Sequence, residues 1–297
     1  MKLVSVIEQG ARRAALLDGE ELFVSDVAEL KSVIAQGLDI RKLPGRWRPL
    51  AQSVLDVPLR PGAVLGTGSN YRDHLDERIA ASDGMNAPRR ELEFFVKTGG
   101  TIAALADPMR LHPSIGLKID QETELALVMG PGCKRGMSEQ ESLDHVFGYL
   151  VANDLTARDR QVRLLSDGSN FMVLGASKNF DGATRFSSYV VSADEVREVN
   201  NLRLTTYLNG ELKQDNSTRN LINSFARIIS FFSQMLTLDA GDVIITGTPG
   251  GTGWGQDAAL GGKGYVPPGC TPSRYLQPGD EVRSVIEQLG EIVFRTE

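Results

Sequence analysis

The sequence predicts a β-rich α+β fold in which a small N-terminal domain precedes a larger one. Short strand-like runs bounded by Gly, Pro, Asn or Asp recur along most of the 297 residues. Helical periodicity is confined to a few segments, and these do not alternate with strands as βαβ units would. A polar, proline-containing connection spans 41–62. We therefore place a domain boundary near residue 60, which gives domains 1–60 and 61–297.

The N-terminal part is expected to contain short strands and one helix. The runs 2–8 and 13–25 read as strands, with "DGE" as a turn inside the second run. The segment 25–37 then has the pattern of a helix that Ser25 caps and Gly37 ends. The expected apolar stripe of this helix comprises Val27, Leu30 and Ile34.

The larger part contains more strands and one long amphipathic helix. Ser138 and Glu141 have capping-box spacing, which predicts a short helix leading into a strand that ends near Asp154. The run 202–214 alternates around "NG", a hairpin turn signal. Further strands are expected in 63–70, in 238–255 before a glycine-rich loop, and twice in 275–296. The helix is expected within 218–236, with a stripe formed by Leu221, Ile222, Phe225, Ile228, Ile229, Phe232 and Leu236.

Composition excludes several classes of protein. The net charge is −6 and no Lys/Arg-rich run occurs, which argues against a nucleic-acid surface. No apolar segment approaches the length of a membrane span, and the first residues lack a signal-peptide profile. Cys133 and Cys270 lie far apart, so we expect no disulfide framework and a reducing, cytoplasmic location.

Glu122 and Glu124 stand at the start of the apolar run 125–129. Side chains two residues apart on a strand share a face, about 7 Å apart. Two carboxylates so placed repel each other and resist desolvation, a conflict that a hard cation such as Mg²⁺ or Mn²⁺ would resolve. Asp154 follows another apolar strand and is a candidate third ligand. The alternative is that these are surface carboxylates at strand ends.

Other candidate residues lie in separate segments. If "NYRDHLDE" is helical, His74 and Glu77 share one face, and the carboxylate can orient the imidazole as a general base. The alternative is a solvated helix face. Lys97 and Lys178 have mostly apolar surroundings, which suits a lysine that reaches water or a buried electrophilic partner. The run 246–253 lacks the Lys-Ser/Thr of a phosphate loop and reads as a tight turn that can approach a ligand.

In order along the chain, these motifs resemble the fumarylacetoacetate hydrolase family over roughly 62–290. The segments that carry the resemblance are "GTGSNYRDHLDE", "FFVKTGGTI", "IDQETELALVMG", "GYLVANDLTARDRQ", "KNFD", "YLNGELKQDNSTRNLI", "LDAGDVIITGTPGG" and "LQPGDEV". The family implies a mixed, rolled and sandwich-like β-structure behind a small N-terminal α/β domain. It also implies a homodimer.

The resemblance implies three groups of functional residues. The family's K-G-F-D-like motif appears here as K-N-F-D, with Asn179 in place of the usual glycine. The implied metal ligands are Glu122, Glu124 and Asp154. The implied catalytic residues are Glu77, Lys178 and His74, which the family places on a lid. The implied substrate contacts are Arg158, Gln161 and Thr248. The stretches 77–90 and 250–275 depart from the pattern and are expected near the site entrance.

The implied activity is metal-dependent hydrolysis of a carbon–carbon bond in a 2,4-dioxo acid of the acylpyruvate type, through a metal-stabilised enolate. Mg²⁺ is the expected cofactor, and Mn²⁺ or Ca²⁺ also suits an all-carboxylate site. The alternative is a decarboxylase, isomerase or hydratase acting on a related 2-oxo acid. A third reading is a non-catalytic ligand-binding protein with a structural cation.

Overall fold

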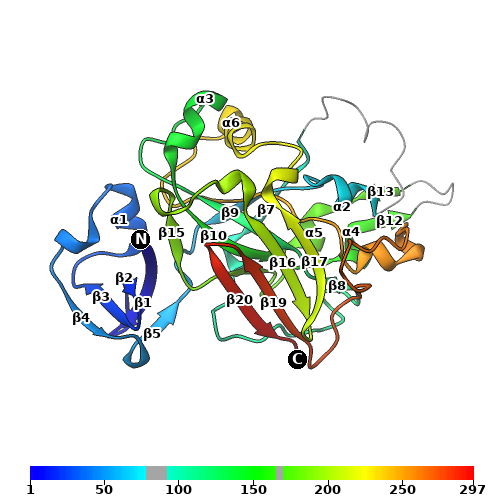
Figure 1. Cartoon of the computed structure of the whole chain (residues 1–297), viewed down its shortest axis with the longest axis horizontal. Helices are drawn as coiled ribbons and strands as arrows, with labels where there is room; N and C mark the ends of the chain where they lie inside the picture. Colours follow the sequence, from blue (N-terminus) through cyan, green and yellow to red (C-terminus); the bar gives the residue numbers. More distant parts are fainter. Residues whose placement is uncertain (78–91, 165–169) are drawn as a thin grey trace.

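The computed structural model describes residues 1–77, 92–164 and 170–297. Within these residues the strands form one 12-stranded sheet, one four-stranded sheet and two two-stranded sheets (Figure 1). Helices are short and few beside the strands, so the predicted β-rich α+β class is confirmed.

The large sheet has the strand order β4-β3-β2-β1-β15-β10-β9-β18-β6-β7, with β14 also paired to β10 and β5 to β1. Neighbouring strands are antiparallel, except that β18 and β6 run parallel. The bounds are β1 (Lys2–Glu8), β2 (Ala11–Asp18), β3 (Glu21–Ser25), β4 (Gly45–Pro49), β5 (Val54–Asp56), β6 (Ala63–Thr67), β7 (Phe94–Thr98), β9 (Thr123–Met129), β10 (Val146–Asp154), β14 (Thr184–Phe186), β15 (Val190–Ser192) and β18 (Val243–Ile245).

The four-stranded sheet has the order β17-β16-β19-β20. Its first two strands form the predicted hairpin, in which Asn209 and Gly210 have φ values of 53° and 81° that suit a tight two-residue turn. The bounds are β16 (Arg203–Leu208), β17 (Glu211–Ser217), β19 (Glu281–Ile286) and β20 (Gly290–Arg295). The two small sheets pair β8 (Ile119–Asp120) with β11 (Thr156–Ala157) and β12 (Val162–Leu164) with β13 (Asn170–Met172).

The α-helices of the described residues are α1 (Leu30–Ala35), α2 (Arg72–Asp76), α3 (Glu139–Ser142), α4 (Arg158–Gln161), α5 (Leu174–Lys178) and α6 (Phe225–Met235). The predicted short helix is present with Ser138 as its N-cap, because the Ser138 hydroxyl accepts a hydrogen bond from the Glu141 amide at the start of α3. In the part of the chain that the structure describes, no helix has both the length and the apolar character needed to cross a bilayer.

The predicted bounds of two helices are wrong. Ser25 does not cap α1, because it is still paired with Gly45 in the ladder between β3 and β4. Val27 accordingly lies outside the helix and is 61% exposed. The long helix begins only at Phe225, where the Ser224 hydroxyl accepts from the Arg227 amide. Three residues of its expected stripe, Leu221, Ile222 and Leu236, therefore lie outside α6.

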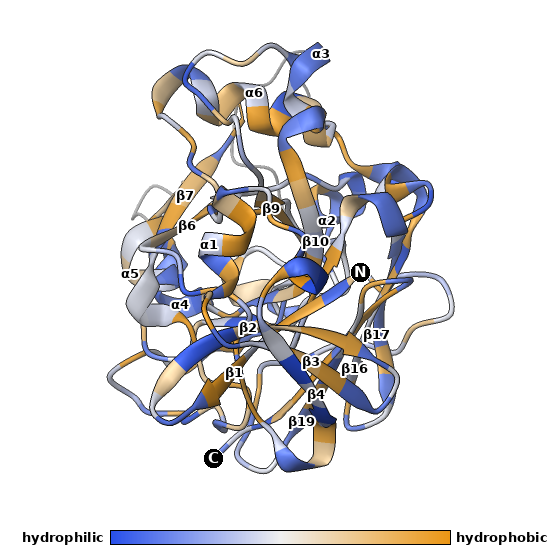
Figure 2. Cartoon of the chain, turned by 90° about the vertical axis from the view of Figure 1, so that its left-hand side faces the viewer, coloured by the Kyte–Doolittle hydropathy of each residue, from blue (hydrophilic) through white to orange (hydrophobic). Residues whose placement is uncertain are grey.

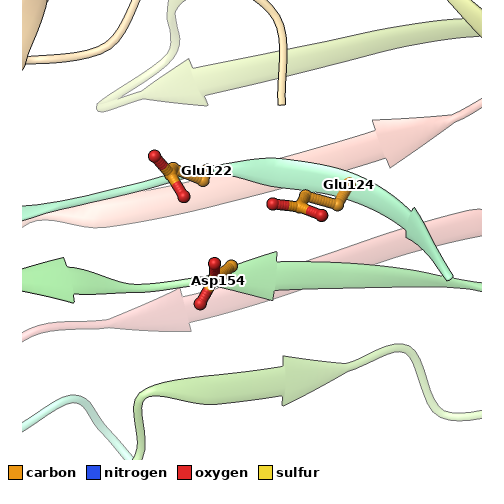
Figure 3. A group of neighbouring side chains, drawn as sticks. All are labelled: Glu122, Glu124 and Asp154. Carbon is orange, nitrogen blue, oxygen red and sulfur yellow. The ribbon is translucent and has the colours of Figure 1, made fainter. Parts of the chain in front are cut away.

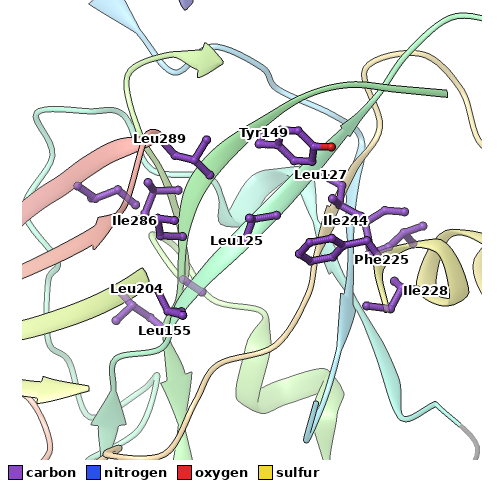
Figure 4. Packing of buried hydrophobic residues seen from close by; sticks show 14 of the residues in the cluster. Leu125, Leu127, Tyr149, Leu155, Leu204, Phe225, Ile228, Ile244, Ile286 and Leu289 are labelled. Carbon is purple, nitrogen blue, oxygen red and sulfur yellow. The ribbon is translucent and has the colours of Figure 1, made fainter. Parts of the chain in front are cut away.

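Strand β9 is buried on both faces, which explains its continuous apolar sequence. Leu125, Leu127 and Met129 belong to one hydrophobic cluster, which includes the apolar face of α6 and residues of β16 and β19 (Figure 4). Ala126 and Val128 face the opposite cluster, which includes residues of α1. Orange segments along the strands in Figure 2 show the same concentration of hydrophobic residues. The central strand is therefore a rigid base for the polar residues at its start.

The N-terminal strands lie at one end of the molecule, coloured blue in Figure 1. They are joined to the rest by β1, which pairs with β15, and β15 in turn pairs with β10. The first residues thus extend the same sheet that carries the candidate site. The division of the chain at residue 60 stays a prediction.

Candidate active site

Three carboxylates meet where β9 and β10 lie side by side. Antiparallel pairing places Ala152 opposite Glu124, and the Asp154 amide donates to the Glu122 carbonyl at 2.9 Å. All three side chains are buried, and one ligand oxygen from each lies within 4.8 Å of the others (Figure 3). Sheet register therefore brings together the three predicted metal ligands, Glu122, Glu124 and Asp154.

Two buried lysines contact opposite oxygens of Asp154. Lys178 Nζ bonds Asp154 Oδ2 and lies 2.7 Å from both Glu122 Oε2 and Thr156 Oγ1. Lys97 Nζ bonds Asp154 Oδ1 and donates to the Ala183 carbonyl at 2.7 Å. Asp154 is thus held on both sides by positive charge, and Lys97 is a buried partner of this carboxylate rather than a lysine that reaches water.

Glu124 differs from its two neighbours because no described lysine or arginine bonds it. Among the described residues, its hydrogen bond comes from the Gly247 amide, at 2.6 Å from Oε2. Burial, followed by the charges of Asp154 and Glu122, raises the pKa of Glu124 well above its ordinary value. Burial also acts on Glu122, but the charges of Arg158 and Lys178 lower the pKa of that carboxyl.

An uncompensated buried carboxylate beside two others fits a divalent cation that binds oxygen ligands. Glu122, Glu124 and Asp154 present their oxygens to one common point between β9 and β10 (Figure 3). The Lys178 ammonium group contacts two of the three carboxylates, Glu122 and Asp154. The donor set therefore suits Mg²⁺ or Mn²⁺ better than a soft metal.

Arg158 is fully buried and bonded on every side. Its Nε donates to Asp120 Oδ2 at 2.9 Å, its Nη1 donates to Gln161 Oε1 at 2.7 Å, and its Nη2 bonds Glu122. The Trp254 ring lies 4.9 Å from the guanidinium carbon. Asp120 also accepts from the Trp254 amide, at 3.0 Å. Asp120 therefore fixes Arg158 to the loop that follows β18.

His74 and Glu77 form the predicted pair at the C-terminal end of α2. His74 Nδ1 lies 2.6 Å from Glu77 Oε1, and both side chains are buried. Glu77 also accepts from the Thr252 hydroxyl at 2.7 Å, from the Gly251 amide at 2.9 Å and from the Thr252 amide at 3.2 Å. These bonds orient the carboxylate toward Nδ1, which leaves Nε2 of His74 for chemistry in the pocket.

These groups surround one pocket with about 580 Å³ of empty space. Of the nine predicted site residues, seven line it, namely His74, Glu122, Glu124, Arg158, Gln161, Lys178 and Thr248. The other two stand directly behind, Glu77 bonded to His74 and Asp154 bonded to Lys178. Thr248 is held by its own bond to the Thr123 carbonyl at 3.0 Å. Phe95, Met172, Leu174 and Trp254 supply apolar walls.

Sequence reasoning missed several residues that hold the site together. Asp120 and Thr252 act only through contacts with residues more than thirty positions away, so no local pattern marks them. Trp254 falls in the stretch 250–275 that was expected near the entrance, and it does line the pocket. The other such stretch, 77–90, lies outside the described residues beyond Glu77.

A pocket that joins buried carboxylates, a lysine and a His–Glu pair has the composition of an enzyme active site with general acid–base chemistry. Comparison with known proteins identifies the enzyme family. The sequence matches the profile "Fumarylacetoacetate (FAA) hydrolase C-terminal" over residues 63–296. The chain therefore belongs to the fumarylacetoacetate hydrolase family of enzymes, as its motifs predicted.

Individual relatives have different named activities. The chain is 32% identical to oxaloacetate tautomerase YisK of Bacillus subtilis over 236 residues, which cover 80% of this chain and 70% of that protein. The fumarylacetoacetate hydrolase of psychrophilic Exiguobacterium antarcticum has the same fold, with a TM-score of 0.77, 28% identity and coverage of 100% and 99%. Maleylpyruvate hydrolase from Sphingobium sp. SYK-6 is similar in fold, with a TM-score of 0.74, 23% identity and the same coverage.

Proposed function

We propose that this chain is a divalent-metal-dependent enzyme that hydrolyses a carbon–carbon bond in 2,4-dioxo acids of the acylpyruvate type. The observation that carries the proposal is the buried His74–Glu77 pair, 2.6 Å apart, on the wall of the pocket that holds the carboxylates. Such a pair can take a proton from water, which hydrolysis requires. A family member that only enolises its substrate needs no activated water.

The carboxylates Glu122, Glu124 and Asp154 would hold Mg²⁺ or Mn²⁺. When bound, the ion supplies Lewis acidity and neutralises negative charge next to a 2-oxo acid. Lys178 adds a positive charge beside this cluster, because its ammonium group contacts Glu122 and Asp154. The site is therefore suited to a substrate with a carboxylate and an adjacent oxo group.

The remaining residues have distinct proposed roles in the reaction. Nε2 of His74 accepts a proton from water, and Glu77 keeps the imidazole in the required tautomer. The activated water attacks the distal carbonyl, and the carbon–carbon bond breaks to leave an enolate. Lys178 and Arg158 offset the negative charge that develops on that enolate. Gln161 and Thr248, on the pocket wall, provide polar contacts that orient the substrate.

A second candidate is keto–enol tautomerisation of a 2-oxo diacid without cleavage. It is favoured by the 32% identity to a relative named oxaloacetate tautomerase. In that reaction His74 would move a proton between carbon and oxygen, and no water would be consumed. The same positive charges would serve both reactions, because both pass through an enolate.

The test is a screen of the purified protein with acylpyruvates, fumarylpyruvate and oxaloacetate, with Mn²⁺ or Mg²⁺ and with EDTA. Mass spectrometry distinguishes hydrolysis, which yields pyruvate and a second acid, from decarboxylation. Decay of the enol absorbance at unchanged mass identifies tautomerisation. His74→Ala and Glu124→Gln serve as inactive controls. Cleavage that persists in either variant, or in EDTA, would refute the proposed mechanism.

A further inference from the structure

Asn179 makes three hydrogen bonds that the glycine usual at this position cannot make. Its Nδ2 donates to the Val96 carbonyl at 3.0 Å and to the Gly175 carbonyl at 3.0 Å. Its Oδ1 accepts from the Thr98 amide at 2.8 Å. The carboxamide therefore joins the end of α5 to strand β7.

These contacts lie at an edge of the large sheet. Among the described strands, β7 is the last of this sheet and pairs only with β6. The outward backbone groups of an edge strand need partners, and here one side chain satisfies the carbonyl of Val96 and the amide of Thr98. Lys97 is the residue between them, so Asn179 fixes the backbone on both sides of this lysine.

The two elements joined by Asn179 each carry a lysine of the site. Lys97 extends from β7 to Oδ1 of Asp154, and Lys178 extends from the last position of α5 to Oδ2 of the same carboxylate. Lys178 Nζ also lies 4.7 Å from the ring centroid of Phe95 on β7. A relative shift of α5 and β7 would move the two ammonium groups apart from the carboxylate between them.

We propose that Asn179 is a positioning residue that locks α5 onto β7 and thereby holds Lys97 and Lys178 on opposite oxygens of Asp154. Asn179 itself does not line the pocket. It acts through the two lysines, and so on the orientation of Asp154. The proposal rests on the role proposed above for Asp154, but its test includes a measurement that requires neither substrate nor metal.

The test compares Asn179→Gly with the wild type and with Asn209→Gly as a matched control. Asn209 also bonds through its carboxamide, donating to Asp280 and accepting from the Glu281 amide, both at 2.8 Å. Its φ of 53° is one that glycine adopts freely. Both substitutions thus remove side-chain hydrogen bonds, but only one of the two asparagines lies beside the site.

Three properties are measured, namely Mn²⁺ affinity by calorimetry, kcat and KM on the substrate found in the screen, and the rate at which acetic anhydride labels Lys97 and Lys178. For Asn179→Gly we expect Mn²⁺ affinity to fall about tenfold, and kcat to fall about tenfold or more. We also expect faster labelling of both lysines. Asn209→Gly is expected to lower Tm and leave all three properties at wild-type values.

Wild-type labelling rates and wild-type Mn²⁺ affinity in Asn179→Gly would overturn the proposal, even if Tm falls, because the residue would then be merely structural. If that variant does not fold, Asn179→Ala is measured in the same way. A wild-type protein that turns over no 2-oxo acid refutes the proposed function alone. The labelling rates still decide the role of Asn179 in that case.

Discussion

Replacing Glu124 by glutamine is expected to stabilise the metal-free protein while removing metal binding. Glutamine has nearly the same size, and its amide oxygen can still accept from the Gly247 amide, which lies 2.6 Å from Oε2 in the structure. The substitution removes the one carboxylate of the three that no described lysine or arginine bonds. A residue kept for function would thus be a source of instability in the absence of the ion.

The size of the effect follows from the spacing of the three carboxylates. At an effective dielectric constant of about 20, two unit charges separated by 4.8 Å repel each other by about 3.5 kcal/mol. The positive charge of Lys178 offsets part of this repulsion. We therefore expect Glu124→Gln to raise the free energy of unfolding by about 1–3 kcal/mol in EDTA at pH 8.

The difference in free energy of unfolding between Glu124→Gln and the wild type should change with pH in one direction. Burial and the charges of Asp154 and Glu122 raise the pKa of Glu124 well above its ordinary value of 4.5. Below pH 4.5 the carboxyl is protonated in both the folded and the unfolded protein, so it does not destabilise the fold. Above pH 4.5, the unfolded state releases the proton more readily than the folded state. The advantage of the variant should therefore grow as pH rises from about 4.5.

The assay is urea denaturation followed by tryptophan fluorescence, across this pH range in EDTA and again with Mn²⁺. With Mn²⁺ at a hundred times its Kd, the wild type should gain about 2.7 kcal/mol. The variant should gain far less, since it lacks one ligand. A variant that is less stable than the wild type in EDTA at pH 8, or equally stabilised by Mn²⁺, would show that the reasoning about Glu124 is wrong.

Three further outcomes are expected. Thr252→Val removes the hydroxyl that donates to Glu77 at 2.7 Å, so kcat should fall about tenfold with an altered pH–rate profile. Phe232→Ala, at a fully buried position of α6, should lose about 3–5 kcal/mol in urea denaturation. Burial would raise the pKa of Asp280, but the bonds from Arg274 hold it at about 2. The ionised Asp280 carboxylate therefore stabilises the folded protein above pH 3.8, and this stabilisation is lost as pH falls through about 2. In an acid titration of stability, Asp280→Asn should not show this loss.

Local sequence patterns predict a structural feature correctly where that feature depends on a few adjacent residues. The N-cap at Ser138 and the turn at Asn209 lie where the sequence predicts them. The spacing of Glu122 and Glu124 showed a conflict that called for a cation. The structure places both carboxylates in the buried position that makes the conflict real. Asp154 was a candidate third ligand because it follows an apolar strand, and the family motifs pointed to the same residue.

Features that depend on tertiary contacts were not predictable from the sequence. Ser25 has a good capping sequence, but its pairing with Gly45 keeps it in a strand. Asp120 matters because Arg158 and the Trp254 amide reach it from other segments. In the sequence, Asn179 is marked only by its departure from the K-G-F-D-like motif of the family. Its proposed positioning role depends on contacts with the strand β7, which lies more than eighty residues earlier in the chain.

The loop after β18 contacts both the His74–Glu77 pair and one of the three carboxylates. Glu77 accepts from the Gly251 amide and the Thr252 hydroxyl, and Glu124 accepts from the Gly247 amide. The Trp254 amide of the same loop also donates to Asp120. A change in the conformation of this loop would therefore shift acidic groups beside α2 and on the buried sheet together, so a single segment can alter the whole pocket.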